Sequence, residues 1–263
     1  MKNIATYALL ALCALFSHTA SAEKVGDIVR AGDKFMMLVR EFNTPESNDA
    51  FQANLNIMTR DSHIINLLKK KLDETSDQNK KKDISAKLKQ VEDTFKKNDE
   101  IMRKAYAFSS SRQYRRTFLE SYICTALSKE ELSNLRSSDG TELDPMLISE
   151  KNKVTLYRHK VVSGEEENRE LQKLINFTMS RRAELGILRK KLGSTTDAAE
   201  QLKISESMAK AEQAIRDNDS ILRKKYGIRD KVDYVIEVAK SKLYLFITPQ
   251  EAADAMKEKA QKK

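Results

Sequence analysis

A long internal repeat constrains the fold of this chain more than any other feature. The segment KKNDEIMRKAYAF at positions 96–108 recurs as RDNDSILRKKYGI at positions 216–228, an offset of 120 residues. The same offset aligns KKLDETSDQNKKKDIS at 70–85 with KKLGSTTDAAEQLKIS at 190–205, without a gap. Similarity at a fixed period indicates a repeated structural unit. We therefore interpret the chain as a tandem duplication of one module.

The polar segment RSSDGTELDP at 136–145 is the best candidate for a linker between the two copies. It divides the chain into repeat module 1 at 23–138 and repeat module 2 at 139–263. If the modules are copies, they should superpose, and Asn98 and Asn218 should occupy similar surroundings.

Residues 1–22 have the pattern of a secretory signal peptide of bacterial type. Lys2 gives a short positive start, residues 4–16 are apolar, and Ala-Ser-Ala at 20–22 fits cleavage before Glu23. A lipoprotein signal ending at Cys13 is the alternative, which the preceding leucine disfavours. No later stretch is long and apolar enough to span a bilayer. We expect a periplasmic or extracellular protein without a transmembrane segment in the mature chain.

The composition favours long, solvated helices. A third of the residues are charged, Trp is absent, and only seven Gly and three Pro are present. The net charge of +9 favours contact with an anionic surface, although Lys-rich helix faces account for it without any partner. No basic block alternates with aromatic residues, so we expect no nucleic-acid binding. The expected partner is a protein or an anionic envelope component.

Each module shows the same order of predicted elements. A β-hairpin opens it, at 27–42 and 147–162, and two long helices follow, separated by loops at 73–83 and 193–201. Asp73 and Gly193 are expected to stop the first helix. The segments 113–127 and 232–247 are then predicted to form a second β-hairpin that pairs with the opening one of the same module.

The fold class is therefore α+β, mostly α. It is a tandem duplication of a module with a long antiparallel helical hairpin, flanked by short β-hairpins forming a small sheet. A capping box is expected where each module begins its last helix, at Ser128 with Glu131 and at Thr248 with Glu251. The tail KEKAQKK is expected to fray.

The two long helices of each module carry apolar residues at steps of three and four, which predicts a packed seam. On the first helix these are Phe51, Leu55, Met58, Ile65, Leu68 and Leu72, and in the second copy Leu171, Ile175, Leu185, Leu188 and Leu192. On the second helix they are Ile84, Leu88, Val91, Phe95, Asn98, Met102 and Ala105, and then Ile204, Met208, Ala211, Ile215, Asn218, Leu222 and Lys225.

A repeat signature of four residue types lies on the second helix of each copy. Its members are Asn98, Asp99, Arg103 and Tyr106, and then Asn218, Asp219, Arg223 and Tyr226. An Asn in a seam fixes the register, Asp and Arg four residues apart form an ion pair, and Tyr anchors the helix end. We favour this structural role over the alternative that the two sets bind a ligand, for which the sequence indicates no chemistry.

Motifs of catalysis are absent. The mature chain has two His, His63 and His159, and neither is matched by a His in the other copy. No H-E-x-x-H, C-x-x-C, G-x-S-x-G or phosphate-binding Gly-rich loop occurs. Cys124 is interpreted as a small buried hydrophobe, with a reactive thiol or an intermolecular bridge as the alternative. We expect no enzyme, no cofactor and no metal site, although a hydrolase with paired carboxylates stays open.

These observations predict a secreted or periplasmic, non-enzymatic binding or scaffold protein. The plan of signal peptide, basic chain, small β body and projecting helical hairpin is similar to that of the Skp/OmpH periplasmic chaperones. That resemblance implies a holding chaperone for unfolded envelope proteins as the alternative function. Those chaperones carry one such unit per chain and assemble as trimers, whereas this chain carries two, so an oligomer is possible. The resemblance assigns no residues.

Overall fold

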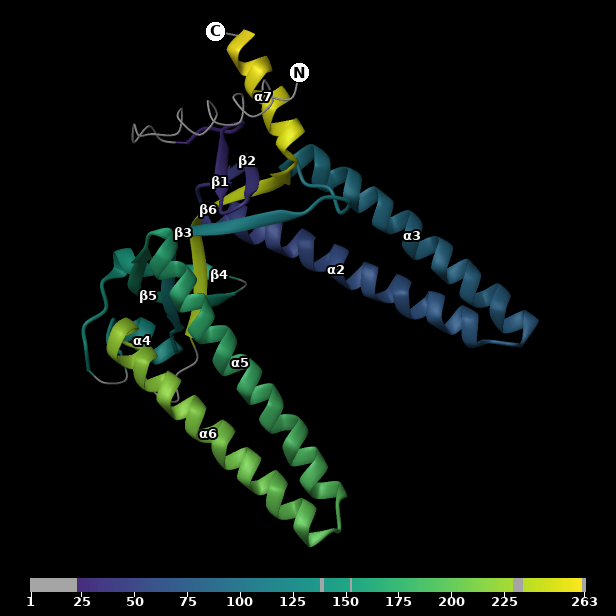
Figure 1. Cartoon of the computed structure of the whole chain (residues 1–263). Coiled ribbons are helices and arrows are strands. Elements are labelled where there is room, and N and C mark those ends of the chain that lie inside the picture. Colours follow the sequence, from purple (N-terminus) through teal and green to yellow (C-terminus); the bar gives the residue numbers. More distant parts are fainter. Residues whose placement is uncertain (1–22, 138–139, 152, 229–233, 262–263) are drawn as a thin grey trace.

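Two long helical hairpins project from one shared β-sheet and diverge from each other (Figure 1). The computed structural model describes residues 23–137, 140–151, 153–228 and 234–261. The predicted signal peptide lies outside the described residues. No helix of the described part is long and apolar enough to cross a membrane.

The sheet has six antiparallel strands in the order β1-β2-β6-β3-β5-β4. The strands are β1 (Ile28–Ala31), β2 (Lys34–Phe42), β3 (Tyr114–Ala126), β4 (Ile148–Lys151), β5 (Val154–Ser163) and β6 (Tyr234–Ile247). The β1–β2 and β4–β5 pairs confirm the two opening hairpins. Gly32 turns the first one at a φ of 65°, a conformation that glycine adopts without strain.

The prediction of a second hairpin in each module is wrong. The segments concerned form the single strands β3 and β6, of 13 and 14 residues. Their central polar residues do not turn the chain, because Glu120 of β3 lies opposite Lys240 of β6 and pairs with it at 2.9 Å. The polar residues that indicated a turn in each segment instead form an ion pair between the two strands.

The predicted pairing within each module is also wrong. β6, from the second half of the chain, pairs with β2 of the first half, and β3 pairs with β5 of the second. β3 and β6 also pair with each other, from Tyr114 opposite Leu245 to Thr125 opposite Tyr234. Each then has one free edge, and the opening hairpin of the other half occupies it. The halves share one sheet and do not form a small sheet each.

The helices are α2 (Pro45–Glu74), α3 (Gln78–Tyr106), α4 (Lys129–Asn134), α5 (Glu165–Ser194), α6 (Ala198–Tyr226) and α7 (Pro249–Gln261). The loops at the hairpin tips are shorter than predicted, at 75–77 and 195–197. Asp73 and Gly193 do not end the helices. Asp77 and Asp197 are the N-caps instead, each accepting two backbone N–H groups.

The capping boxes before the last helix of each half are confirmed. In each, the hydroxyl accepts the backbone N–H of the glutamate at 3.2 Å, and the glutamate accepts the N–H of the capping residue. The tail expected to fray is largely helical, because α7 extends to Gln261.

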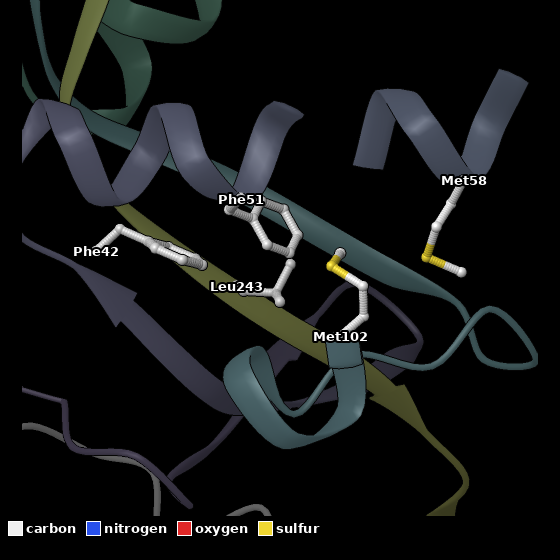
Figure 2. Close-up of a cluster of buried hydrophobic side chains, with 5 residues drawn as sticks. All are labelled: Phe42, Phe51, Met58, Met102 and Leu243. Carbon is white, nitrogen blue, oxygen red and sulfur yellow. The ribbon is translucent and has the colours of Figure 1, made fainter. Parts of the chain in front are cut away.

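Each helical hairpin packs on a strand from the other half of the chain. The first core contains Phe42 of β2, Phe51 and Met58 of α2, Met102 of α3 and Leu243 of β6 (Figure 2). The second core contains Ile123 of β3, Val162, Leu171, Leu222 and Tyr226. Full burial of each large apolar side chain contributes about 1.5–3 kcal/mol. Separating the halves would expose both cores.

The two halves match element by element. α2 begins at Pro45 and α5 at Glu165, and α3 begins at Gln78 and α6 at Ala198, an offset of 120 residues in each case. The strand order is unchanged when β1, β2 and β3 exchange places with β4, β5 and β6. Under the same exchange, Glu120 and Lys240 map onto each other, so this ion pair marks the centre of the arrangement.

Candidate functional site

The asparagines of the repeat signature both bond to the facing helix of their own hairpin, with different partners. Asn98 donates to Asp61 of α2 at 3.4 Å and is half-buried. Asn218 is buried and donates to the Leu174 carbonyl at 2.8 Å and to the Thr178 hydroxyl at 2.7 Å. Both contacts can fix the register of a helix pair. The expectation of similar surroundings therefore fails at the level of hydrogen-bond partners.

The acidic members of the signature also differ between the halves. Asp99 is buried and accepts Nη2 of Arg103 at 2.6 Å and the backbone N–H of Ser110 at 2.7 Å. Burial raises the pKa of Asp99, but the N–H of Ser110 and the Arg103 guanidinium outweigh it and lower the pKa. Asp219 accepts the Thr178 hydroxyl at 3.5 Å. Asp99 thus ties the end of α3 to the loop before β3.

The tyrosines close the ends of the hairpins nearest the sheet. The Tyr106 ring lies edge-on to Phe51 at 5.1 Å, and its hydroxyl accepts Nδ2 of Asn54 at 3.3 Å. Tyr226 is buried, and its hydroxyl donates to the Glu167 carbonyl at 3.4 Å. The rings and hydroxyls described here contact only their own hairpin and the sheet beneath it. This geometry supports the structural interpretation of the signature.

A cavity of about 280 Å³ between β1 and α7 brings two carboxylates together. Glu23 bonds to the Tyr244 hydroxyl at 2.6 Å and to Lys242, and Asp27 pairs with Lys259. Burial raises the pKa of Glu23, but these hydrogen bonds outweigh burial, so the pKa is lowered. The pKa of Asp27 is also lowered, by the backbone N–H of Lys24 and by Lys259. A carboxylate pair for glycoside hydrolysis needs one member that stays protonated. Here both are held ionised.

The cysteine and the two histidines of the described chain lie on different elements: Cys124 on β3, His159 on the neighbouring strand β5, and His63 on α2. Cys124 is fully buried in β3, and desolvation raises the pKa of its thiol to about 12, so the thiol is protonated at neutral pH. This favours the interpretation as a small hydrophobe. His159 contacts the Thr125 hydroxyl at 2.5 Å, whereas His63 is exposed on α2. Among the described residues, no three His, Cys, Asp or Glu side chains are placed to hold a metal ion.

Two arginines that the sequence analysis did not single out lie on the inner strands β3 and β5 of the sheet. Arg116 of β3 bonds to Oδ1 of Asn48 at 2.5 Å and to Oγ of Ser241 at 3.1 Å, and desolvation lowers its pKa to about 10. Arg158 of β5 pairs with buried Glu237 at 2.9 Å. A charged residue within the alternating pattern of each strand was the signal in the sequence that could have indicated these arginines. Their partners could not be predicted, because they come from distant segments of the chain.

The helical hairpins expose large apolar side chains at matching positions. On the first hairpin these are Ile57, Leu67 and Ile101, exposed by 39%, 45% and 55%, and on the second Phe177, Ile187 and Ile221, exposed by 38%, 60% and 47%. Each member of the first set is 120 residues from one of the second. A single exposed apolar side chain is normal, but a repeated set indicates a surface used in both hairpins.

Ile57 and Ile101 lie on the same face of the first hairpin. Hydrogen bonds join Asn54 to Tyr106 and Asp61 to Asn98 across the two antiparallel helices. Ile57 lies between the two bonded positions of α2 and Ile101 between those of α3, so the two isoleucines are at about the same height along the hairpin. At 100° per residue, each isoleucine lies about a quarter-turn from its own seam, towards the same side. Phe177 and Ile221 are at the equivalent positions of the second hairpin. We call Ile57 with Ile101, and Phe177 with Ile221, the apolar pairs.

The second hairpin also has a shallow groove of about 470 Å³ between α5 and α6. Leu185 and Ile215 line it together with Arg182, Arg189 and Arg216. On the described parts of the hairpins, the surfaces available to a partner are convex helix faces and an open groove. In comparisons with protein-family models, curated proteins and solved structures, no match to this chain was found.

Proposed function

We propose that the protein is a non-enzymatic binding or scaffold protein that holds a protein partner with its two projecting hairpins. The observation that carries this proposal is the presence of an apolar pair at the same place on both hairpins. Because the sequence predicts a signal peptide, we propose that this activity takes place in the periplasm or outside the cell.

The shape of the molecule supports a role in reaching a partner. A helix of 30 residues, such as α2, extends about 45 Å. A hairpin of that length exceeds what is needed to cover the sheet, because the core that α2 shares with the sheet reaches only to Met58. The rest of each hairpin is free to contact another molecule along its length.

The test places a photo-crosslinking amino acid at position 101 or 221 of the full chain in the producing cell. A scaffold with one partner is expected to give one discrete adduct from both positions. Met146 is 85% exposed and lies in the turn before β4, outside the helices of both hairpins, and position 146 is the matched control. Equal adducts from 146 and from the hairpin positions would contradict the proposal.

Truncating both apolar pairs tests the same surface by affinity. The test uses a variant with four substitutions: Ile57→Ser, Ile101→Ser, Phe177→Ser and Ile221→Ser. It should weaken partner binding at least about 100-fold, because each substitution removes apolar area that the bound partner would bury. Met146→Ser should leave it unchanged.

A holding chaperone is the second candidate. The apolar pairs favour it, because they lie on open helix faces that can contact many sequences without a defined pocket. The likeness in plan to the Skp/OmpH chaperones adds to this. Crosslinking would then give a broad set of adducts, and the protein should suppress aggregation of an unfolded outer-membrane protein at near-stoichiometric ratio. No effect on aggregation would rule out this candidate.

We also infer that the halves descend from one duplicated segment. The aligned sequences, the common offset of the helices and the exchange symmetry of the sheet support this inference. The different partners of Asn98 and Asn218 would then reflect divergence after duplication. A relative with a single module should form a two-fold dimer with the same strand order.

A further inference from the structure

The tips of the two hairpins have loops of the same length and different charges. The first tip, residues 69–89, carries eight lysines and four carboxylates, a net charge of +4. The second tip, residues 189–209, carries four basic and three acidic residues, a net charge of +1. We propose that the first tip docks on an anionic membrane surface through its lysines.

The lysines of the first tip are available for contact. Lys69 pairs with Glu92 at 3.1 Å and Lys70 with Glu74 at 3.8 Å. The remaining six form no ion pair with any residue that the structure describes, and all except half-buried Lys81 are exposed. They are Lys71, Lys80, Lys81, Lys82, Lys87 and Lys89. Most of the positive charge is thus not neutralised within the chain.

The geometry of the tip suits a surface better than a cleft-bound ligand. The lysine runs 69–71 and 80–82 lie on two helices, on either side of the three-residue loop 75–77. This is the end of the hairpin farthest from the sheet (Figure 1). Lys is a mobile point charge that requires no fixed partner geometry, unlike the planar guanidinium of Arg. Such charges at a convex end match an array of lipid phosphates.

The absence of apolar surface at the first tip distinguishes a membrane from a protein partner. No large apolar side chain within the described residues 69–89 is exposed, and Leu72, Ile84 and Leu88 are half-buried. Specific protein interfaces bury an apolar and aromatic centre. The first tip offers only charge, so its contact with lipid would be peripheral, without insertion, and sensitive to salt.

This inference goes beyond the proposed function. The apolar pairs lie nearer the sheet than the lysines, so a protein partner and a membrane can be bound at the same time. The first hairpin would then position the protein at a lipid surface while both hairpins hold the partner.

Vesicle flotation with the full mature chain tests the proposal. The probes are vesicles of phosphatidylcholine alone and vesicles with about 30 mol% phosphatidylglycerol. Binding is expected only to the anionic vesicles, and it should be lost when the salt rises from about 0.05 M to about 0.5 M.

The second tip supplies residues for a matched variant. Lys80→Glu, Lys81→Gln, Lys87→Ser and Lys89→Ala introduce the types present at Glu200, Gln201, Ser207 and Ala209. Each lysine near an anionic leaflet contributes about five-fold in partitioning, so the variant should bind at least about 100-fold more weakly.

The reverse variant carries lysines at positions 200, 201, 207 and 209 in the depleted chain. It should regain binding through the second tip, and it tests the proposal even if the first variant folds poorly. Vesicle binding that is unchanged in the depleted variant, or equal binding to neutral vesicles, would overturn the proposal. So would binding to a soluble polyanion such as heparin without binding to vesicles.

The crosslinking experiment at positions 101 and 221 separates the two proposals. Its adducts should be unchanged in the lysine-depleted variant, because the apolar pairs are intact. Failure of vesicle binding with normal adducts overturns only the membrane inference. Loss of adducts with normal vesicle binding overturns only the proposed function.

Discussion

At the scale of single residues, the two halves of the chain provide substitutions for each other. The ion pair between Arg158 and Glu237 is largely removed from solvent, and the Arg158 guanidinium lies 4.5 Å from the centre of the Tyr122 ring. The equivalent positions in the other half hold Leu38 and Thr117, both buried. Uncharged residues therefore occupy the positions of the other half that are equivalent to this ion pair.

Glu237→Thr alone should destabilise the protein by about 3 kcal/mol, because it leaves the Arg158 charge without its buried partner. The double variant Arg158→Leu with Glu237→Thr should lie within about 1 kcal/mol of the unchanged protein. Urea unfolding measures both. A double variant less stable than either single variant would mean that the two halves do not tolerate each other's residues here.

At the scale of elements, the second long helix of each half ends in the left-handed conformation. Ala107 ends α3 at a φ of 53°, and Gly227 ends α6 at a φ of 70°. Glycine adopts this conformation without the steric cost that a Cβ atom brings. No heavy atom lies within 4 Å of a Cβ built on Gly227, so conformation alone decides the effect of a substitution there.

Ala107→Gly should therefore stabilise the protein by about 0.5–1 kcal/mol, and Gly227→Ala should destabilise it by a similar amount. The two melting temperatures should move in opposite directions from that of the unchanged chain. Shifts in the same direction would show that contacts beyond the helix cap control these positions.

At the scale of the whole molecule, the exchanged strands connect the halves. β3 pairs with β6 and β5, and each core includes a strand residue from the other half. The covalent connection through 136–145 is therefore not needed to keep the halves together.

A protease site introduced between Ser137 and Thr141 should be cut without separating the halves. The two fragments should elute as one species in size-exclusion chromatography and part only in denaturant. Separate peaks under native conditions would contradict the strand exchange. The uncut protein under the same conditions is the control.

The sequence alone determined the local elements. Periodic apolar residues predicted both helical hairpins, Gly32 and its neighbours predicted the first β-turn, and Ser128 and Thr248 predicted caps. Each of these depends on residues a few positions apart. The apolar pairs were not predicted, because Ile57 and Ile101 come together only when the helices pack.

Only the tertiary structure decided which strands pair. The polar residues at the middle of 113–127 and 232–247 look like turns when each segment is considered separately. Glu120 and Lys240 continue their strands because each meets the opposite charge of the other, 120 residues away. In local terms, each of these two strands is equally compatible with either opening hairpin. β2 and β3 are both antiparallel to β6, so these two strands of the same half run in the same direction, and antiparallel pairing joins each of them to β6 of the other half.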